Sequence, residues 1–248
     1  TAFAEHLVEA AALLPSIDGV CKVHFTVPNW STDMFAHEFN DSRDRIEVLN
    51  ELDWEIELSI QDPATDTPAM SLEQEPFRTS EGELLFRPGG HGALLPNLGS
   101  AGGDVIVIKN IDNVVPDAHR ALVLTWRRNL VEELLEVEEQ THRLIRSLLA
   151  GEDVVRPARA FLLRTYGVRC ASPTAIFDSL NRPIRVCGMV QNRGEPGGGP
   201  FWVQSGEYSV PQIVEGAQIQ ADQRDKLAES THFNPVELVC SVRDYRGH

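Results

Sequence analysis

The chain has 248 residues, 42% hydrophobic and 24% charged, a composition typical of a globular protein rather than of a disordered or fibrous one. Asp and Glu outnumber Lys and Arg by 37 to 22, which gives a formal net charge of −15. That charge repels polyphosphate backbones and anionic bilayers, so nucleic acids and membranes are excluded as general partners. The sequence shows no bilayer-length apolar run, no signal-peptide pattern and four scattered cysteines, so we expect a cytoplasmic protein with free thiols.

Hydrophobic periodicity predicts the elements of the first half in chain order. We expect a helix over 2–14, a buried strand over 20–27, a helix from 31–33 to about 52, and a strand over 54–61. Residues 62–104 are rich in Pro, Gly and acidic side chains and are expected to be mostly irregular. Within them, a short apolar run over 84–95 opens into a glycine-rich loop.

The second half begins with the clearest core strand, over 105–110, followed by the longest helix, from 117 to about 150. Further strands are predicted over 183–192, 201–204, 212–219 and 237–242, with a short helix near 222–230. The apolar stripe of the long helix, which we expect to pack on the domain, comprises Trp126, Leu130, Leu134, Val137, Thr141, Ile145 and Leu148. Strands alternating with helices predict one α/β domain over residues 1–248, built on a mostly parallel sheet with flanking helices.

Open α/β sheets bind ligands in the loops beyond the carboxyl ends of their strands, and three such loops stand out. The first is the glycine-rich loop 88–92, whose missing Cβ atoms would let the backbone approach a base or a phosphate. It is neither a Walker A loop nor a dinucleotide-binding fingerprint. The alternative is that it is only a turn.

The second loop is Asp112-Asn113, directly after the core strand. A carboxylate there needs a positive partner, and Mg²⁺ carried in by phosphates would supply one. Alternatively, Asp112 caps a turn or pairs with Lys109 or an arginine. The third loop, 194–200, has three successive glycines, which indicate close approach of a ligand or of another backbone, or else a flexible hairpin tip.

Other catalytic arrangements find little support in the sequence. There is no zinc-binding His pattern and no Gly-x-Ser-x-Gly elbow, which disfavours a serine hydrolase. His24 lies inside an apolar strand, and we interpret it as a hydrogen-bonded core histidine rather than a base. His232 lies among polar groups, and we interpret it as structural.

Taken in order, the segments RPGGHG, VIVIKNIDNVV, QIVEGAQI and THFNPVELV resemble the uridine-diphosphate-sugar pyrophosphorylase superfamily. Those proteins have a Pro-x-Gly-Asn/His-Gly nucleotide loop, a strand ending in Asp-Asn, a Val-Glu strand that contacts the sugar, and a later Asn-bearing segment. A closer resemblance, over essentially the whole chain, is to an uncharacterised bacterial family, a domain of unknown function that is a distant relative of those enzymes. It is carried by EHLVEAA, VCKVHFTV, LLFRPGGHGALL, IKNIDNVVPD, GEPGGGPFWV and STHFNPVELVC.

The resemblance implies a Rossmann-like nucleotide-diphospho-sugar transferase fold and transfer of a nucleotidyl group onto a sugar 1-phosphate, with release of pyrophosphate. The residues that would hold the nucleoside base or ribose are Pro88, Gly89, Gly90, His91 and Gly92. Asp112 would be the catalytic residue that ligates Mg²⁺, and Glu215 and Asn234 would contact the sugar. Phosphoryl transfer mainly needs positioning and charge stabilisation, which fits the absence of a nucleophile motif.

The chain departs from this pattern in two ways. Gly216, Ala217 and Gln218 stand where the pyrophosphorylases have Tyr-Ser-Glu, so the sugar and the base stay open. Both families begin with a small-residue loop ending in Arg that cradles the triphosphate; no such loop occurs here, and we expect a fragment whose loop precedes Thr1. The alternatives to a nucleotidyltransferase are a non-catalytic nucleotide-sugar binding module and an interaction domain whose long helix docks a partner; the oligomeric state stays open.

Overall fold

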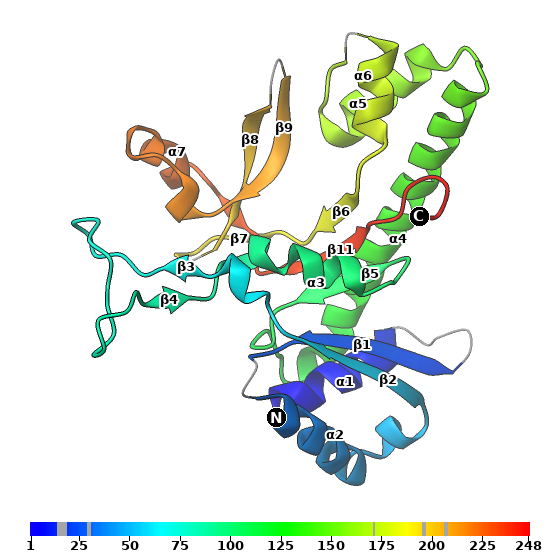
Figure 1. The fold of residues 1–248 in the computed structure, drawn as a ribbon. Helices are drawn as coiled ribbons and strands as arrows, with labels where there is room; N and C mark the ends of the chain where they lie inside the picture. The colour runs from blue at the N-terminus through cyan, green and yellow to red at the C-terminus, as the bar shows by residue number, and fades with distance from the viewer. Residues whose placement is uncertain (14–18, 29–30, 171, 195–196, 206–207) are drawn as a thin grey trace. The chain divides into compact units, whose positions relative to one another are not determined.

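The computed structural model describes residues 1–13, 19–28, 31–170, 172–194, 197–205 and 208–248 (Figure 1). The chain forms two compact units, Thr1–Gly102 and Gly103–His248. Each unit has a hydrophobic core of its own.

The first unit is built on two parallel strands, β1 (Val20–Thr26) and β2 (Asp53–Ser59). Parallel neighbours need a crossover connection, and α2 (Thr32–Arg45) with the short helix η2 (Glu47–Asn50) provides it. Helices α1 (Ala2–Leu13) and α2 cover one face of this pair (Figure 1). The buried core residues between them are Phe3, Leu7, Phe25, Val27 and Leu49.

The rest of the first unit has little regular structure, as the composition of 62–104 predicts. It contains η3 (Pro63–Thr65), a minimal hairpin of β3 (Thr67–Pro68) and β4 (Phe86–Arg87), η4 (His91–Leu94) and α3 (Leu95–Ser100). Most side chains between β3 and β4 are exposed. Within the apolar run over 84–95, only Phe86 and Arg87 form a strand.

The second unit is organised by the long helix α4 (Asp117–Leu149), which matches the helix predicted from 117 to about 150. Its core face packs against α5 (Val155–Tyr166) and α6 (Pro173–Leu180). The predicted apolar stripe is wrong at one end, since Trp126 is 63% exposed whereas Arg127 is only 3% exposed. The buried residues of α4 lie three, four or seven positions apart, on a face that passes beside Trp126; they are Leu124, Arg127, Leu134, Val137, Thr141 and Ile145.

The strands of the second unit are short. A three-stranded antiparallel sheet places β11 (Glu237–Ser241) between β5 (Ile106–Lys109) and β6 (Ile184–Cys187). Two antiparallel pairs accompany it: β7 (Val190–Gln191) with β10 (His232–Phe233), and β8 (Gly199–Ser205) with β9 (Tyr208–Val214). The short helices η5 (Gly216–Gln218), η6 (Ala221–Gln223) and α7 (Arg224–Ala228) lie between β9 and β10 in the chain.

The predicted Rossmann-like fold with a mostly parallel sheet is wrong. Within the described residues, β1 and β2 make the single parallel pairing, and the other pairings join short antiparallel strands. Connection lengths explain the difference: only two residues separate β8 from β9, far fewer than a parallel crossover requires. The last strand, β11, enters between β5 and β6 in the opposite direction, so these two strands never become neighbours.

All four cysteines are free thiols. Burial raises the pKa of Cys21, Cys187 and Cys240, the last of these to about 11. Among the helices in the described ranges, none combines the length and the apolar character needed to cross a membrane.

Candidate functional site

The two faces of the β1–β2 pair differ in character. The register places Lys22 opposite Glu55, His24 opposite Glu57 and Thr26 opposite Ser59. Since side chains alternate between faces along a strand, these six share the face opposite the one that packs on α1 and α2. The predicted strand over 54–61 therefore presents an apolar row to the core and a polar row on its other face.

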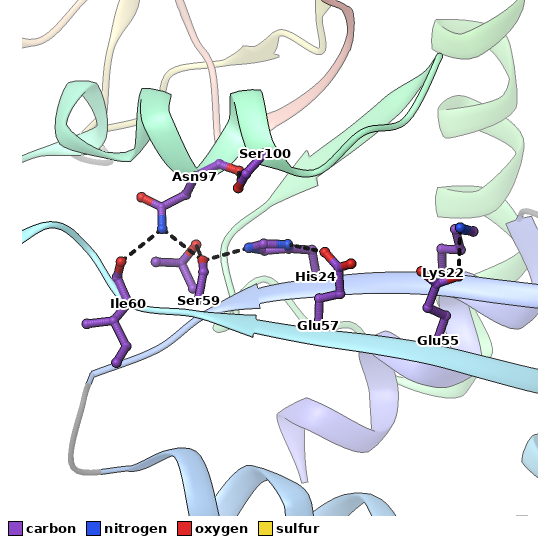
Figure 2. A network of polar contacts seen from close by, with 9 residues as sticks. Lys22, His24, Glu55, Glu57, Ser59, Ile60, Asn97 and Ser100 are labelled. Carbon is purple, nitrogen blue, oxygen red and sulfur yellow. Dashed lines mark hydrogen bonds and ion pairs between the residues drawn. The ribbon is translucent and has the colours of Figure 1, made fainter.

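His24 is the centre of this polar row (Figure 2). Its Nε2 atom lies 2.6 Å from Ser59 Oγ, and its Nδ1 atom lies 3.2 Å from Glu57 Oε2. Thr26 Oγ1 lies 3.2 Å from the same Ser59 oxygen. His24 is hydrogen-bonded, as the sequence analysis expects, but it belongs to this polar network and not to the apolar core.

A separate ion pair lies at the amino-terminal end of the polar row, away from Thr26 and Ser59 (Figure 2). Lys22 Nζ lies 2.6 Å from Glu55 Oε2. The hydrogen bond and the charge of Glu55 raise the pKa of the Lys22 ammonium group. Because Glu55 pairs with Lys22, Glu57 is the carboxylate of the row that pairs with His24.

Helix α3 joins the polar row to the glycine-rich loop that precedes it. Asn97 Nδ2 donates to Ser59 Oγ at 2.8 Å and to the carbonyl oxygen of Ile60 at 3.1 Å (Figure 2). The Asn97 carbonyl in turn accepts a hydrogen bond from Ser100 Oγ at 2.8 Å. These bonds hold α3 at the carboxyl end of β2, where α/β proteins with parallel strands place their ligands.

Loop 88–92, the predicted nucleotide loop, leads into this anchored helix. Gly89 packs closely against its surroundings, because a Cβ atom there would lie 2.7 Å from the carbonyl oxygen of Thr65. Gly90 and Gly92 differ: neither has a positive φ, and a Cβ atom on either would meet no atom within 4 Å. Pro88 and His91 are exposed.

The second unit holds the other predicted site residues. Asp112 follows β5 in a turn in which the Val114 amide donates to the Asp112 carbonyl oxygen at 2.9 Å. Its carboxylate is exposed and makes no hydrogen bond or ion pair with another described residue. No group of three or more His, Cys, Asp or Glu side chains placed to hold a metal ion occurs in the described part of the chain. If Asp112 holds Mg²⁺, phosphate and water oxygens would have to supply much of the ligand shell.

Asn234, predicted to contact the sugar, is 5% exposed and its side chain is occupied by the backbone around it. Its Nδ2 atom donates to the carbonyl oxygens of Gly188 at 2.7 Å and Glu237 at 3.2 Å, and its Oδ1 atom accepts from the Val236 amide at 3.0 Å. The Asn234 amide donates to the Gly198 carbonyl oxygen at 2.8 Å. Asn234 thus connects its own segment, 234–237, with the segments around Gly188 and Gly198.

The other predicted residues of this unit gather around Asn234. Asn113 Nδ2 donates to the carbonyl oxygen of the adjacent Pro235. Glu215 lies beside Gly198, where a Cβ atom would come within 3.0 Å of Glu215 Oε1. The loops at 112–113, 198, 215 and 234 are therefore neighbours, although they are far apart in the sequence. Glu195 and Pro196, within the predicted loop 194–200, lie outside the described residues.

The glycines at 197–199 are explained by contacts within the protein. A Cβ atom would lie 2.6 Å from the Phe233 ring at position 197, 2.5 Å from Ile213 at position 198 and 2.7 Å from Ser230 Oγ at position 199. The sequence left open whether a ligand or another backbone approaches this loop or whether it is a flexible hairpin tip. In the structure, other parts of the chain lie close to Gly197, Gly198 and Gly199.

We did not predict a role for Glu57, Ser59, Asn97 or Arg127 from the sequence. Glu57 and Ser59 could have been found from the alternation in 54–61, which puts them on one face, but their partner His24 comes from a distant strand. Arg127 lies seven residues before Leu134 on the buried face of α4 and forms an ion pair with Glu237. The seven-residue spacing could have indicated from the sequence that Arg127 lies on the buried face. Nothing in the sequence places Asn97 beside Ser59.

Comparison with known proteins gives the family of the chain. No curated protein and no solved structure matches it. The model of a domain of unknown function, DUF4301, matches residues 1–248. This finding supports the closer of the two resemblances, to an uncharacterised family, and adds no link to the nucleotide-sugar enzymes. Since the match spans every residue of the sequence, the chain belongs to the DUF4301 family.

Proposed function

We propose that this protein binds a nucleotide or nucleotide sugar through loop 88–92. The observation that carries the proposal is the surroundings of Gly90 and Gly92. Gly90 has φ −71° and ψ −170°, a conformation open to most residues, and no neighbouring atom excludes a side chain at either position. A glycine needed neither for its backbone angles nor for internal packing is explained by close approach of a ligand to the backbone.

The position of the loop supports the same function. Asn97 holds the helix that follows the loop at the carboxyl end of β2, so the loop lies beside the end of a parallel strand pair. The backbone groups of such a loop can contact the edges of a base or the hydroxyls of a ribose. The second unit by itself exposes Asp112 and Glu215, the residues that the resemblance assigns to Mg²⁺ and to the sugar, and the Glu215 side chain also accepts a hydrogen bond from the Gln218 backbone amide.

The finer proposal is transfer of a nucleotidyl group onto a sugar 1-phosphate with release of pyrophosphate. Its alternative is binding without turnover. The resemblance of the ordered motifs supports the transfer reaction, whereas the substitutions at Gly216, Ala217 and Gln218 favour the alternative. Release of pyrophosphate from a nucleoside triphosphate and a sugar 1-phosphate, measured with and without Mg²⁺, separates the two.

Binding is tested by thermal unfolding with a panel of nucleoside triphosphates and nucleotide sugars. A ligand at 100 times its dissociation constant adds about 2.7 kcal/mol of stability, which should raise the midpoint by roughly 5–10 °C. We expect Gly90→Leu to abolish this shift because its side chain would occupy the ligand's position. Gly99→Leu is the matched control, since position 99 also has open space around a Cβ atom but lies within α3.

Two results would contradict the proposal. One is the absence of a shift with every nucleotide tested; the other is a shift that Gly90→Leu leaves intact. For the Mg²⁺ part, Asp112→Asn should reduce a Mg²⁺-dependent shift without changing the midpoint of the unliganded protein, because the Asp112 carboxylate makes no hydrogen bond or ion pair with another described residue.

A further inference from the structure

A serine, a histidine and a glutamate are linked in series on the polar face of β1–β2 (Figure 2). Ser59 Oγ lies 2.6 Å from His24 Nε2, and His24 Nδ1 lies 3.2 Å from Glu57 Oε2. Both contacts are hydrogen bonds, and each uses a different ring nitrogen. This connectivity of nucleophile, base and orienting carboxylate is found in enzymes that activate a serine, on folds otherwise unrelated. It does not require the Gly-x-Ser-x-Gly elbow whose absence disfavours one class of serine hydrolase, and it makes His24 a candidate base although the sequence favours a structural role.

The hydrogen-bond partners define where the protons lie. When Glu57 is ionised and the imidazole is neutral, His24 carries its proton on Nδ1 and donates it to Glu57. Nε2 is then an acceptor and takes the hydrogen bond of the Ser59 hydroxyl. His24 is thereby in the tautomer that a general base for Ser59 requires.

The remaining partners of Ser59 Oγ are donors. Asn97 Nδ2 donates at 2.8 Å, and the Thr26 hydroxyl, at 3.2 Å, is left to donate as well. The Asn97 amide therefore fixes the position of the oxygen that would attack. The longer bond, to the exposed Thr26, is the one that must break to free a lone pair for attack.

Access favours chemistry at this position. Ser59 is half-buried at the carboxyl end of its strand, and the side chain of Glu57 is 53% exposed whereas that of His24 is 21% exposed. Ser59 as a residue thus keeps some exposure to solvent, and His24 is the less exposed member of its pair with Glu57.

From this geometry we infer that Ser59 is a nucleophile that hydrolyses small carboxylic esters, with His24 as general base and Glu57 as the residue that orients it. Ser59 Oγ forms a bond to the ester carbonyl carbon, and its proton passes to His24 Nε2. The ester C–O bond breaks, and the leaving alcohol takes that proton. Water then attacks the acyl-serine, its proton passes through Nε2 back to Ser59 Oγ, and the carboxylic acid departs. This activity does not depend on nucleotide binding at loop 88–92.

Labelling with a fluorophosphonate, read by mass spectrometry of the digested protein, tests the nucleophile directly. We expect one adduct, on Ser59, that is absent from Ser59→Ala and retained in Ser80→Ala, a control serine exposed in the same unit. Thr26→Val should label at least as fast as the wild type, because it removes the donor that competes for the attacking lone pair while keeping a residue suited to a strand.

Turnover of p-nitrophenyl acetate tests the base and the orienting residue. His24→Gln should lower kcat by about 100-fold or more, the size of a general-base contribution. Glu57→Gln should also lower kcat with KM unchanged, since a glutamine amide neither fixes the Nδ1–H tautomer nor balances the charge of a protonated imidazole. Circular dichroism of each variant checks that the fold is retained.

The proposal is overturned if the wild-type protein is neither labelled at Ser59 nor active on the ester. It is also overturned if Ser59→Ala keeps its turnover while remaining folded. A result in which His24→Gln labels as fast as the wild type would leave Ser59 without its base, and would reduce the network to a set of structural hydrogen bonds.

Discussion

Two glycine-rich segments of this chain, one in each unit, look alike in sequence and differ in structure. At 197–199, each glycine is in close contact with side chains or backbone of the second unit, so a Cβ atom would collide. At Gly90 and Gly92, in the first unit, a Cβ atom would meet open space. A glycine run is therefore a better indication of a ligand site where neither backbone angles nor internal packing require the glycines.

The largest expected effect concerns Asn234, which connects the segments around the packed glycines. Asn234→Ala removes the donor to two buried backbone carbonyls and the acceptor of the Val236 amide, so we expect a loss of about 2–4 kcal/mol. Urea unfolding followed by circular dichroism measures it. Asn97→Ala, at a half-buried position of the first unit, should cost only about 0.5–1.5 kcal/mol. Equal losses for the two variants would show that Asn234 is not the organising residue of its region.

A smaller loss of stability is expected for a substitution at Gly198, which lies beside Asn234. Gly198→Ala places a methyl group 2.5 Å from Ile213 Cγ2 and 3.0 Å from Glu215 Oε1, so the hairpin must shift. Overpacking of this kind costs about 1–3 kcal/mol, measured by the same urea titration. If Gly198→Ala proved neutral, the contrast between the two glycine segments would not hold.

The smallest effect on stability is expected in loop 88–92. Gly92→Ala lies in a helical turn with open space around the new methyl group, so the substitution should be neutral or stabilise the protein by up to about 1 kcal/mol. Thermal unfolding without ligand measures this change. A clear loss of stability would mean that the loop has an internal packing role, and would remove the main support for a ligand site there.

The local elements of this protein were largely predictable, because they depend on short-range patterns. The apolar periodicity of α1 and α4 and the β-branched run of β1 are visible within about a dozen residues. The sheet topology was not predictable, because β11 pairs with β5 and β6 across more than a hundred and about fifty residues, respectively, and nothing local records its direction. The alternation of helices and strands favoured a parallel sheet, which the two-residue separation of β8 and β9 rules out for that pair.

The same distinction between local patterns and long-range contacts applies to the candidate sites. The exposed glycine loop and Asp112 could be selected from the sequence, because each follows a recognisable apolar run. The role of Asn234 as a buried connector could not, since its partners Gly188, Gly198 and Glu237 come from three segments. The His24–Ser59 contact was equally hidden, because it depends on the register between two strands and not on either strand alone.

That register has a consequence for how the first unit tolerates change. A single-residue insertion or deletion within β2 would turn Glu57 and Ser59 toward the core and expose Ile56 and Leu58, because successive side chains point to opposite faces. The polar row and the hydrophobic core are thus set by one alignment of the two strands. Variation in length is therefore expected in the loops around β1 and β2 and not within them, and a homologue that keeps this core keeps the geometry of the row with it.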